Sequence, residues 1–358
     1  MLKQRHSNPA GLITETHKGE LSLKKMKIFN IITVVFCLLI LITGCRKDLD
    51  ELTTGEETVL TESTTVFIEG DENPTILSGN INDFFTVSQN SIQTSSIDSE
   101  TTNLVYGQNG TLLNIPSGIF QFMNGTPVSG MVDLELIEIF FKDDMVRSNK
   151  PTTAGGALLV SGGELYIMAY QNGEKLEIIP GESMTIRVPT VTNYGTPWEM
   201  TKFYGTEMED GTVDWELAEN AQVQLTESMD TIGLAFEFPE TRLGWINCDY
   251  FYDQSNLTSV TIFVPEENTS TNTAVFLIFE DIHSVCRISN YDADNNYFIS
   301  NGNYSLPEGL DVTAFAVSKA GDVYTAAFVP FQITTDIVVP ITLEEMSLEN
   351  IHAQLQSY

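Results

Sequence analysis

Short segments in which apolar and polar residues alternate run through most of the chain from Val66 onward, and they constrain the fold more than any other feature. In Met184–Val188 and Val260–Val264 every second residue is apolar, as expected for strands with one buried face. Ala274–Phe279 is continuously apolar, which is typical of a central strand. Because helical patterns between the strands are missing, the sequence predicts an all-β fold of tandem antiparallel β-sandwich modules and excludes a parallel α/β sheet.

One strand changes its apolar face part-way along. The apolar residues are first Val132, Leu134 and Leu136, and then Ile137, Ile139 and Phe141. We expect either a β-bulge or burial on both faces at this point.

Turn and end signals support the all-β interpretation. Asn172-Gly173 and Asp210-Gly211 each separate two strand-like segments and favour tight hairpin turns. Pro340 predicts an edge strand or a strand end, because proline cannot donate to a β ladder. Only the tail looks helical. Thr342 and Glu345 have capping-box spacing, and Leu348, Ile351 and Leu355 share one helical face.

The segment Met26–Cys45 predicts a cleaved lipoprotein signal peptide. Lysines lie at and before its start, and an apolar run from Ile28 to Ile42 follows. The run ends in Leu-Ile-Thr-Gly-Cys, which resembles the bacterial lipobox, so we expect Cys45 to be lipidated. A retained membrane helix is the alternative, but the run is at the lower limit of the roughly 17–25 residues that a span needs. Residues 1–25 are interpreted as an over-extension before Met26.

The sequence predicts that the whole chain divides into five parts. We expect a signal peptide at 1–44, a lipidated, acidic, disordered tether at 45–65, β-sandwich regions at 66–252 and 253–343, and a short helical tail at 344–358. Lys47-Asp48, with Asp50 and Glu51, resembles the signal that routes lipoproteins of some Bacteroidota to the outer surface. The predicted location is therefore the outer membrane or cell surface, with a periplasm-facing position as the alternative.

The charge of the chain excludes one class of partner. Six of the 17 Lys and Arg and two of the 49 acidic residues precede Cys45, so the mature part carries 11 basic and 47 acidic residues, a formal charge of −36. Such a surface repels phosphate backbones, which excludes nucleic acid as a partner. Attachment to the membrane must then come from the lipid.

Several blocks resemble a known family. These blocks are Gln108-Asn109-Gly110-Thr111, Ile115-Pro116 with Phe120, Gly125–Gly130, Pro151-Thr152, Leu158–Glu164 with Ala169, and Gly244–Asp249. Together they resemble secreted lipoproteins of Bacteroidota whose central part is similar to ZU5-like β-sandwich modules, over roughly Leu104–Asp249. The resemblance implies a ZU5-like first region, followed by an Ig-like second region, and a location in the envelope. It carries no catalytic residues onto this chain. Asp230-Thr231-Ile232 also resembles a short O-glycosylation site.

The sequence predicts no catalytic, cofactor-binding or metal-binding residues. After Cys45 the only histidines are His283 and His352, without the spacing of a zinc site, and His283 is interpreted as a hydrogen-bonded strand residue. Asp292, Asp294 and Asn296 resemble the start of a calcium loop that lacks its later ligands.

The sequence leaves alternative roles open for the cysteine and tryptophan residues. Cys248 and Cys286 could form a disulfide or remain buried thiols. Trp245 is predicted to fill the core, with its indole N–H bonded to a carbonyl, and carbohydrate stacking by Trp198, Trp215 or Trp245 is the alternative.

Three functions are compatible with this sequence. The first is a non-enzymatic interaction module that presents its loops to a glycan, peptide or partner protein. The second is a purely structural spacer of an envelope assembly. The third, which we rank last, is an acidic glycoside hydrolase that uses paired carboxylates.

Replacing Cys45 with alanine tests the anchor. Acyl chains contribute about 0.8 kcal/mol per buried methylene, so we expect Cys45→Ala to move the protein from the membrane to the soluble fraction. Mass spectrometry should find the lipid on Cys45 of the wild-type protein. Cys37→Ala, which alters only the leader, should stay membrane-bound. An unmodified Cys45 with the preceding apolar residues still attached would refute the prediction.

Overall fold

The all-β prediction is confirmed by the computed structural model, which describes residues 80–190, 199–227, 234–252, 256–300 and 305–358. Strands make up 54% of the structure, and the helices are short. None of the helices in these ranges is long and apolar enough to cross a membrane. The predicted leader, Cys45, the tether, Trp198 and Asp230-Thr231-Ile232 lie outside the described residues.

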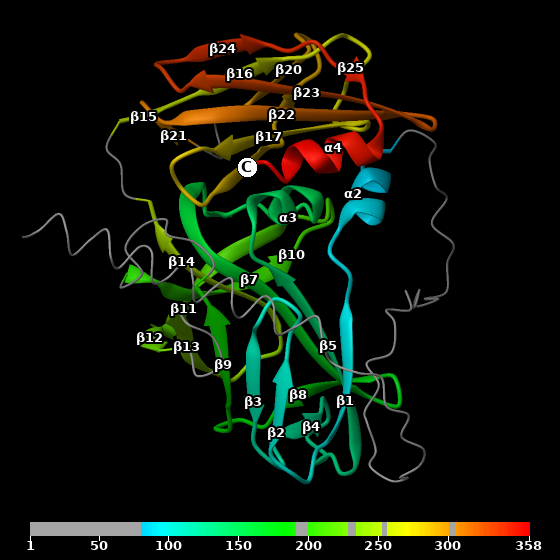
Figure 1. Cartoon of the computed structure of the whole chain (residues 1–358), viewed down its shortest axis with the longest axis vertical. Coiled ribbons are helices and arrows are strands. Elements are labelled where there is room, and N and C mark those ends of the chain that lie inside the picture. The colour runs from blue at the N-terminus through cyan, green and yellow to red at the C-terminus, as the bar shows by residue number, and fades with distance from the viewer. Residues whose placement is uncertain (1–79, 191–198, 228–233, 253–255, 301–304) are drawn as a thin grey trace, which may run out of the picture. The chain divides into compact units, whose positions relative to one another are not determined.

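The first β-sandwich consists of two antiparallel sheets (Figure 1). In its larger sheet the order is β1 (Gln93–Asp98), β5 (Met131–Ile139), β7 (Ala157–Gln171), β14 (Gly244–Phe251), β10 (Thr201–Glu207) and β11 (Val213–Gln222). β6 (Thr153–Ala154) and β8 (Glu174–Ile178) pair with β7, and β4 (Phe120–Phe122) pairs with β8. In the facing sheet the order is β12 (Gln224–Glu227), β13 (Leu234–Glu240), β9 (Met184–Pro189), β3 (Leu112–Ile115) and β2 (Asn103–Tyr106). Buried residues of both sheets, such as Leu134 and Ile186, form the first core.

The second β-sandwich also has two sheets. One has the order β18 (Val285–Ile288), β17 (Thr273–Phe279), β22 (Asp311–Ala320), β23 (Val323–Gln332) and β25 (Glu344–Glu345). The other has the order β19 (Tyr291–Asp292), β20 (Tyr297–Ile299), β16 (Val260–Phe263) and β24 (Ile337–Pro340), and only β16 and β24 pair in parallel among the described strands. β15 (Leu257–Thr258) pairs with β21 (Leu306–Pro307). Val275 and Ile262 contribute to the second core, which lies between the sheets.

A third core, which we call the joint, connects the two sandwiches. It contains Leu159 and Trp245 from the larger sheet of the first sandwich and Phe276 and Phe315 from the second. Three helices also contribute buried side chains to it: α2 (Asn82–Ser88), α3 (Lys142–Arg147) and α4 (Leu348–Leu355). Figure 1 shows these helices between the two sandwiches.

The joint explains the strands that are apolar on both faces. Along β17, Ala274, Phe276 and Ile278 face the joint, while the residues between them face the second core. In β5 the pairing with β7 is continuous from Asp133 to Ile139, so the change of face reflects burial on both sides and not a bulge. Phe141, which the alternation placed on the second apolar face together with Ile137 and Ile139, lies beyond the end of the strand with 46% of its surface exposed.

Most turn and end predictions are confirmed, with two differences. Asn172 and Gly173 both have positive φ in the tight turn between β7 and β8, as predicted. At Asp210-Gly211 the hairpin forms, but only Gly211 has positive φ and the loop is longer, with Gly211 N donating to Met208 O. Pro340 ends the edge strand β24.

The C-terminal helix is confirmed, but its cap was predicted at the wrong residue. Ser347 caps α4, and its side chain accepts a hydrogen bond from Asn350 N. Thr342 does not cap the helix, because β25 lies between that residue and the helix start. Ile351 and Leu355 are fully buried on one face, as the spacing predicts.

A buried carboxylate explains the Gln108–Thr111 block. Glu138 Oε1 accepts from Thr111 N at 3.0 Å, and Oε2 accepts from Asn109 N at 2.8 Å and from Gln93 Nε2 at 2.9 Å. A Cβ atom on Gly107 would lie 2.5 Å from Glu138 Oε1, so only glycine allows this approach. The carboxylate of β5 thus fastens the β2–β3 hairpin of one sheet to the edge of the other.

Glu138→Gln tests this fastening. The amide cannot accept all three hydrogen bonds, so we expect the free energy of unfolding to fall by about 1.5–3 kcal/mol, as measured by urea denaturation. Asp133→Asn, an exposed carboxylate change on the same strand, is the matched control and should have little effect. Equal effects of the two changes would contradict the assignment.

Candidate binding site

Most chemically notable residues of the sequence are buried in structural roles. Trp215 and Trp245 are 2% and 8% exposed, so neither presents a ring for carbohydrate stacking. Trp215 Nε1 donates to Pro151 O at 3.1 Å. The predicted carbonyl partner of Trp245 is wrong, because its indole N–H is buried without a hydrogen-bond acceptor among the described residues and Lys150 Nζ lies 4.8 Å from its ring centre.

The cysteines and the acidic loop also have structural roles. Cys248 and Cys286 are free buried thiols in different cores, which excludes the disulfide alternative in this structure. Asp292 Oδ1 accepts from Asp294 N and Asn295 N, so this carboxylate closes the turn between β19 and β20. Among the described residues no group of three or more His, Cys, Asp or Glu is placed to hold a metal ion.

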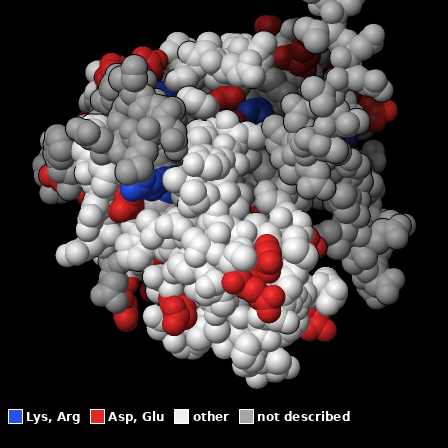
Figure 2. Space-filling model, turned by 60° about the horizontal axis from the view of Figure 1, so that its bottom comes forward, with Lys and Arg blue, Asp and Glu red and all other residues white. Residues whose placement is uncertain are grey.

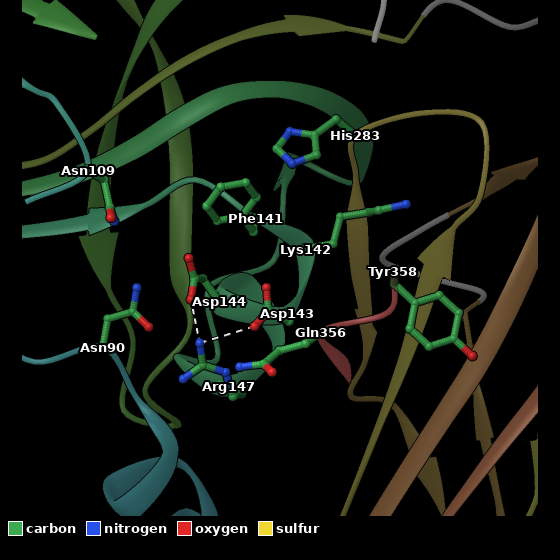
Figure 3. Close-up of a pocket in the computed structure, with 10 residues that line it drawn as sticks. All are labelled: Asn90, Asn109, Phe141, Lys142, Asp143, Asp144, Arg147, His283, Gln356 and Tyr358. Atoms are coloured by element: carbon green, nitrogen blue, oxygen red, sulfur yellow. Dashed lines mark hydrogen bonds and ion pairs between the residues drawn. The ribbon is translucent and has the colours of Figure 1, made fainter. Parts of the chain in front are cut away.

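A pocket of about 560 Å³ lies beside α3, at the edge of the joint. This volume is in the range of roughly 300–1,000 Å³ that is typical of small-molecule sites. Its lining comes from distant parts of the chain: the end of α2, the β2–β3 hairpin, α3, the β17–β18 loop and the segment after α4. Figure 3 shows Phe141 between Asn109 on one side and Gln356 and Tyr358 on the other.

The charged residues of α3 form an internal network. Arg147 Nη2 donates to Asp143 Oδ2 at 3.2 Å and to Asp144 Oδ1 at 2.5 Å, and Nη1 donates to Ser88 O. Burial, together with the neighbouring Asp143, raises the pKa of Asp144, while Arg147 acts in the opposite direction. One guanidinium therefore holds both carboxylates on the same side of the pocket.

The basic groups at the other end of the lining are also engaged. Lys142 Nζ donates to Phe279 O at 2.6 Å, and burial lowers the pKa of this amine against the opposing effect of Glu280 and Asp281. His283 Nδ1 lies 2.7 Å from Ser161 O, and burial lowers the pKa of the imidazole to about 4. His283 is therefore neutral at pH 7. It lies in the loop between β17 and β18 and not in a strand, as the sequence suggested, although it is hydrogen-bonded as expected.

Four lining residues keep groups available for a ligand. The side-chain amides of Asn109 and Gln356 and the hydroxyl of Tyr358 make no hydrogen bond to another described residue, and the Phe141 ring is exposed. The main chain of Asn109 is fixed by Glu138, and that of Gln356 by His352 O. The pocket thus presents polar and aromatic groups on a backbone that the fold holds in place.

Known proteins provide no identification. Neither the models of known protein families nor the well-characterised proteins contain a match to this chain. The resemblance to ZU5-like lipoproteins stays a prediction, and a function has to be inferred from the site itself.

The sequence did not indicate this pocket. It singled out the Gln108–Thr111 block, but the fold alone brings Asn109 of this block to the same pocket as α3. The exposed Phe141 was placed on an apolar face of the strand by the alternation. The available signal was the position of Phe141. It directly follows Phe140, which is fully buried, and it precedes the first turn of α3.

A second group of acids lies inside the molecule, away from solvent. Glu164 on β7 and Asp249 on β14 are fully buried, and neither carboxyl oxygen of Glu164 has a hydrogen-bond partner among the described residues. Burial raises the pKa of both groups well above the ordinary value, and the Asp249 charge raises that of Glu164 further. Asn247 Nδ2 donates to Asp249 Oδ2 at 2.7 Å. Glu164 therefore favours its protonated form more strongly than an ordinary glutamic acid does.

This raised pKa predicts that stability decreases with rising pH. A raised carboxyl pKa contributes stability that is complete below about pH 4 and is lost as the pH rises toward the folded-state pKa. Between about pH 7 and pH 8, which lies between the titration midpoints of histidine and of thiols in the unfolded chain, the free energy of unfolding should fall by up to about 1.4 kcal/mol per pH unit for each retained proton.

Glu164→Gln, which resembles the protonated acid, should make this slope shallower. Glu182→Gln, at an exposed turn, should leave it unchanged. Denaturation midpoints measured across this pH range decide the question, and an unchanged slope in Glu164→Gln would show that Glu164 retains no proton in this range.

Proposed function

We propose that this chain is a lipid-anchored cell-envelope protein that acts without catalysis and binds a ligand in the pocket beside α3. The observation that carries the proposal is the set of unengaged hydrogen-bonding groups, on Asn109, Gln356 and Tyr358, beside the exposed ring of Phe141. A glycan, a peptide or a segment of a partner protein could satisfy these groups. The lipobox-like ending at Cys45 supports the anchor and the location in the outer membrane or at the cell surface.

The geometry of the acids supports binding over hydrolysis. A glycoside hydrolase needs two carboxyl groups on opposite sides of the scissile bond. Asp143 and Asp144 are consecutive residues of one short helix, and both bond to the same nitrogen of Arg147. Such a pair orients an arginine and cannot flank a substrate.

The joint favours a second candidate function, that of a spacer. Polar contacts within it are buried and cross from one sandwich to the other: Thr152 Oγ1 lies 2.8 Å from Ser284 Oγ, and Arg287 Nη1 donates to Asn149 Oδ1 at 2.8 Å. With the large shared core, these contacts would keep two sandwiches at a fixed separation. In this alternative the pocket has no ligand.

A fluorophore at the pocket rim separates the two candidates. Ser357→Cys places an exposed thiol at the rim, between the lining residues Gln356 and Tyr358, and Cys248 and Cys286 are too buried to compete for the label. We expect a saturable change in emission with at least one member of a panel of saccharides, short peptides and amino acids. The same label at Glu182→Cys, far along the first sandwich, should not respond. A panel without any response at Ser357→Cys would leave the spacer as the function.

A further inference from the structure

The charges of the pocket cancel within the protein. Two cations, Lys142 and Arg147, accompany two carboxyl groups, Asp143 and Asp144, and His283 is neutral. Each of the two cations is bound to an oxygen of the protein, at 2.5 to 3.2 Å. A charged ligand would have to break one of these pairs, at the cost of leaving its partner buried and unpaired. This argues for an uncharged ligand.

The surroundings disfavour anions further. The mature chain has a formal charge of −36, and Figure 2 shows acidic side chains in several separate groups on the first sandwich, with basic side chains confined to a few spots. A field of this sign lowers the local concentration of anionic ligands. Acidic polysaccharides and phosphorylated ligands therefore fit poorly.

The available groups match the chemistry of a sugar. A carboxamide offers a carbonyl acceptor and two N–H donors in one plane, and it can bond to neighbouring hydroxyl groups, each of which donates and accepts. An aromatic ring contributes an apolar face with little loss of side-chain entropy. The pocket combines these elements: two unengaged amides, at Asn109 and Gln356, on opposite sides of the exposed ring of Phe141 (Figure 3).

We propose that the pocket beside α3 binds a short neutral saccharide, with the Phe141 ring under an apolar sugar face and the Asn109 and Gln356 amides on its hydroxyl groups. This inference rests on the proposed binding function and narrows it to one ligand class. Tyr358, whose ring stacks on Phe328 with centroids 6.1 Å apart, closes the far end of the pocket.

Phe263, which is 37% exposed, provides a matched comparison outside the pocket. Phe263 on β16 and Tyr297 on β20 are cross-strand partners, with ring centroids 5.2 Å apart and planes at 62°. Because the two rings are strongly inclined, they do not form a flat platform for a sugar. Tyr297 is also hydrogen-bonded to Asp292. Phe263→Ala therefore removes an exposed phenylalanine ring outside the pocket.

The test uses the full-length, detergent-solubilised protein and an array of neutral, uronic-acid-containing and sulfated oligosaccharides. We expect binding to one or more neutral oligosaccharides and none to the anionic ones. Phe141→Ala and Asn109→Ala should each weaken this binding about tenfold, equivalent to roughly 1.4 kcal/mol, and Phe263→Ala should leave it unchanged. The Asn109 change is compatible with folding because only the backbone N–H of that residue holds Glu138. Melting temperatures of all three variants verify the fold.

Each other result overturns the inference. Binding that is lost in Phe263→Ala and kept in Phe141→Ala would place a sugar site on the second sandwich. Binding only to anionic sugars would contradict the charge argument. If no oligosaccharide binds while the Ser357→Cys label responds to a peptide, the saccharide inference fails and the proposed binding function stands. If nothing binds in either experiment, both fail.

Discussion

The structure depends on one apolar surface that two sandwiches share. β7 and β5 in the first sandwich and β17 and β22 in the second are covered on both faces, so each sandwich uses the other as the cover of its second face. At about 25 cal/mol per Å² of buried apolar surface, aromatic side chains such as Phe276, Phe315 and Trp245 contribute much of the stability here. Neither sandwich could expose this surface to water without a large cost, which explains why the described residues of both sandwiches form one compact unit.

The joint also determines which polar side chains are bonded internally or have shifted pKa values. Strands that are buried on both faces have no solvent side, so any polar residue on them must bond internally or lose its charge. On β7 and β14, Ser161, Asn247 and Asp249 form a connected set, and beside these strands Lys142 of α3 and His283 of the β17–β18 loop bond to backbone carbonyls. Glu164 has no such bond among the described residues, and burial raises the pKa of its carboxyl group. The shifted pKa values thus follow from the architecture and are not by themselves signs of catalysis.

Sequence patterns predicted the elements better than their assembly. Alternation located β9 and β16, a continuous apolar run located β17, and glycine turns located the hairpins, because these features are set by neighbours along the chain. The same patterns could not show which surface covers the second face of β5, and they placed Phe141 on an apolar face of a strand that ends before it. The capping error has a similar cause: Thr342 has the right local spacing, but pairing of Glu344 and Glu345 with β23 delays the helix. The pocket was beyond sequence reasoning, since its residues extend from Asn90 to Tyr358 and meet only after the two sandwiches pack.

The position of the pocket at the edge of the joint connects the two candidate functions. Its walls belong to both sides: Asn90 and Asn109 lie with the first sandwich, whereas Gln356 and Tyr358 follow the helix that packs under the second. A ligand that bridges these walls would stabilise their relative position by binding to the packed arrangement only. Conversely, a joint that is already rigid holds the backbone of Asn109 and Gln356 in place, which reduces the entropy lost when a ligand binds. The rigidity that would suit a spacer is therefore also what a preorganised binding site requires, and the unengaged groups around Phe141 distinguish the two.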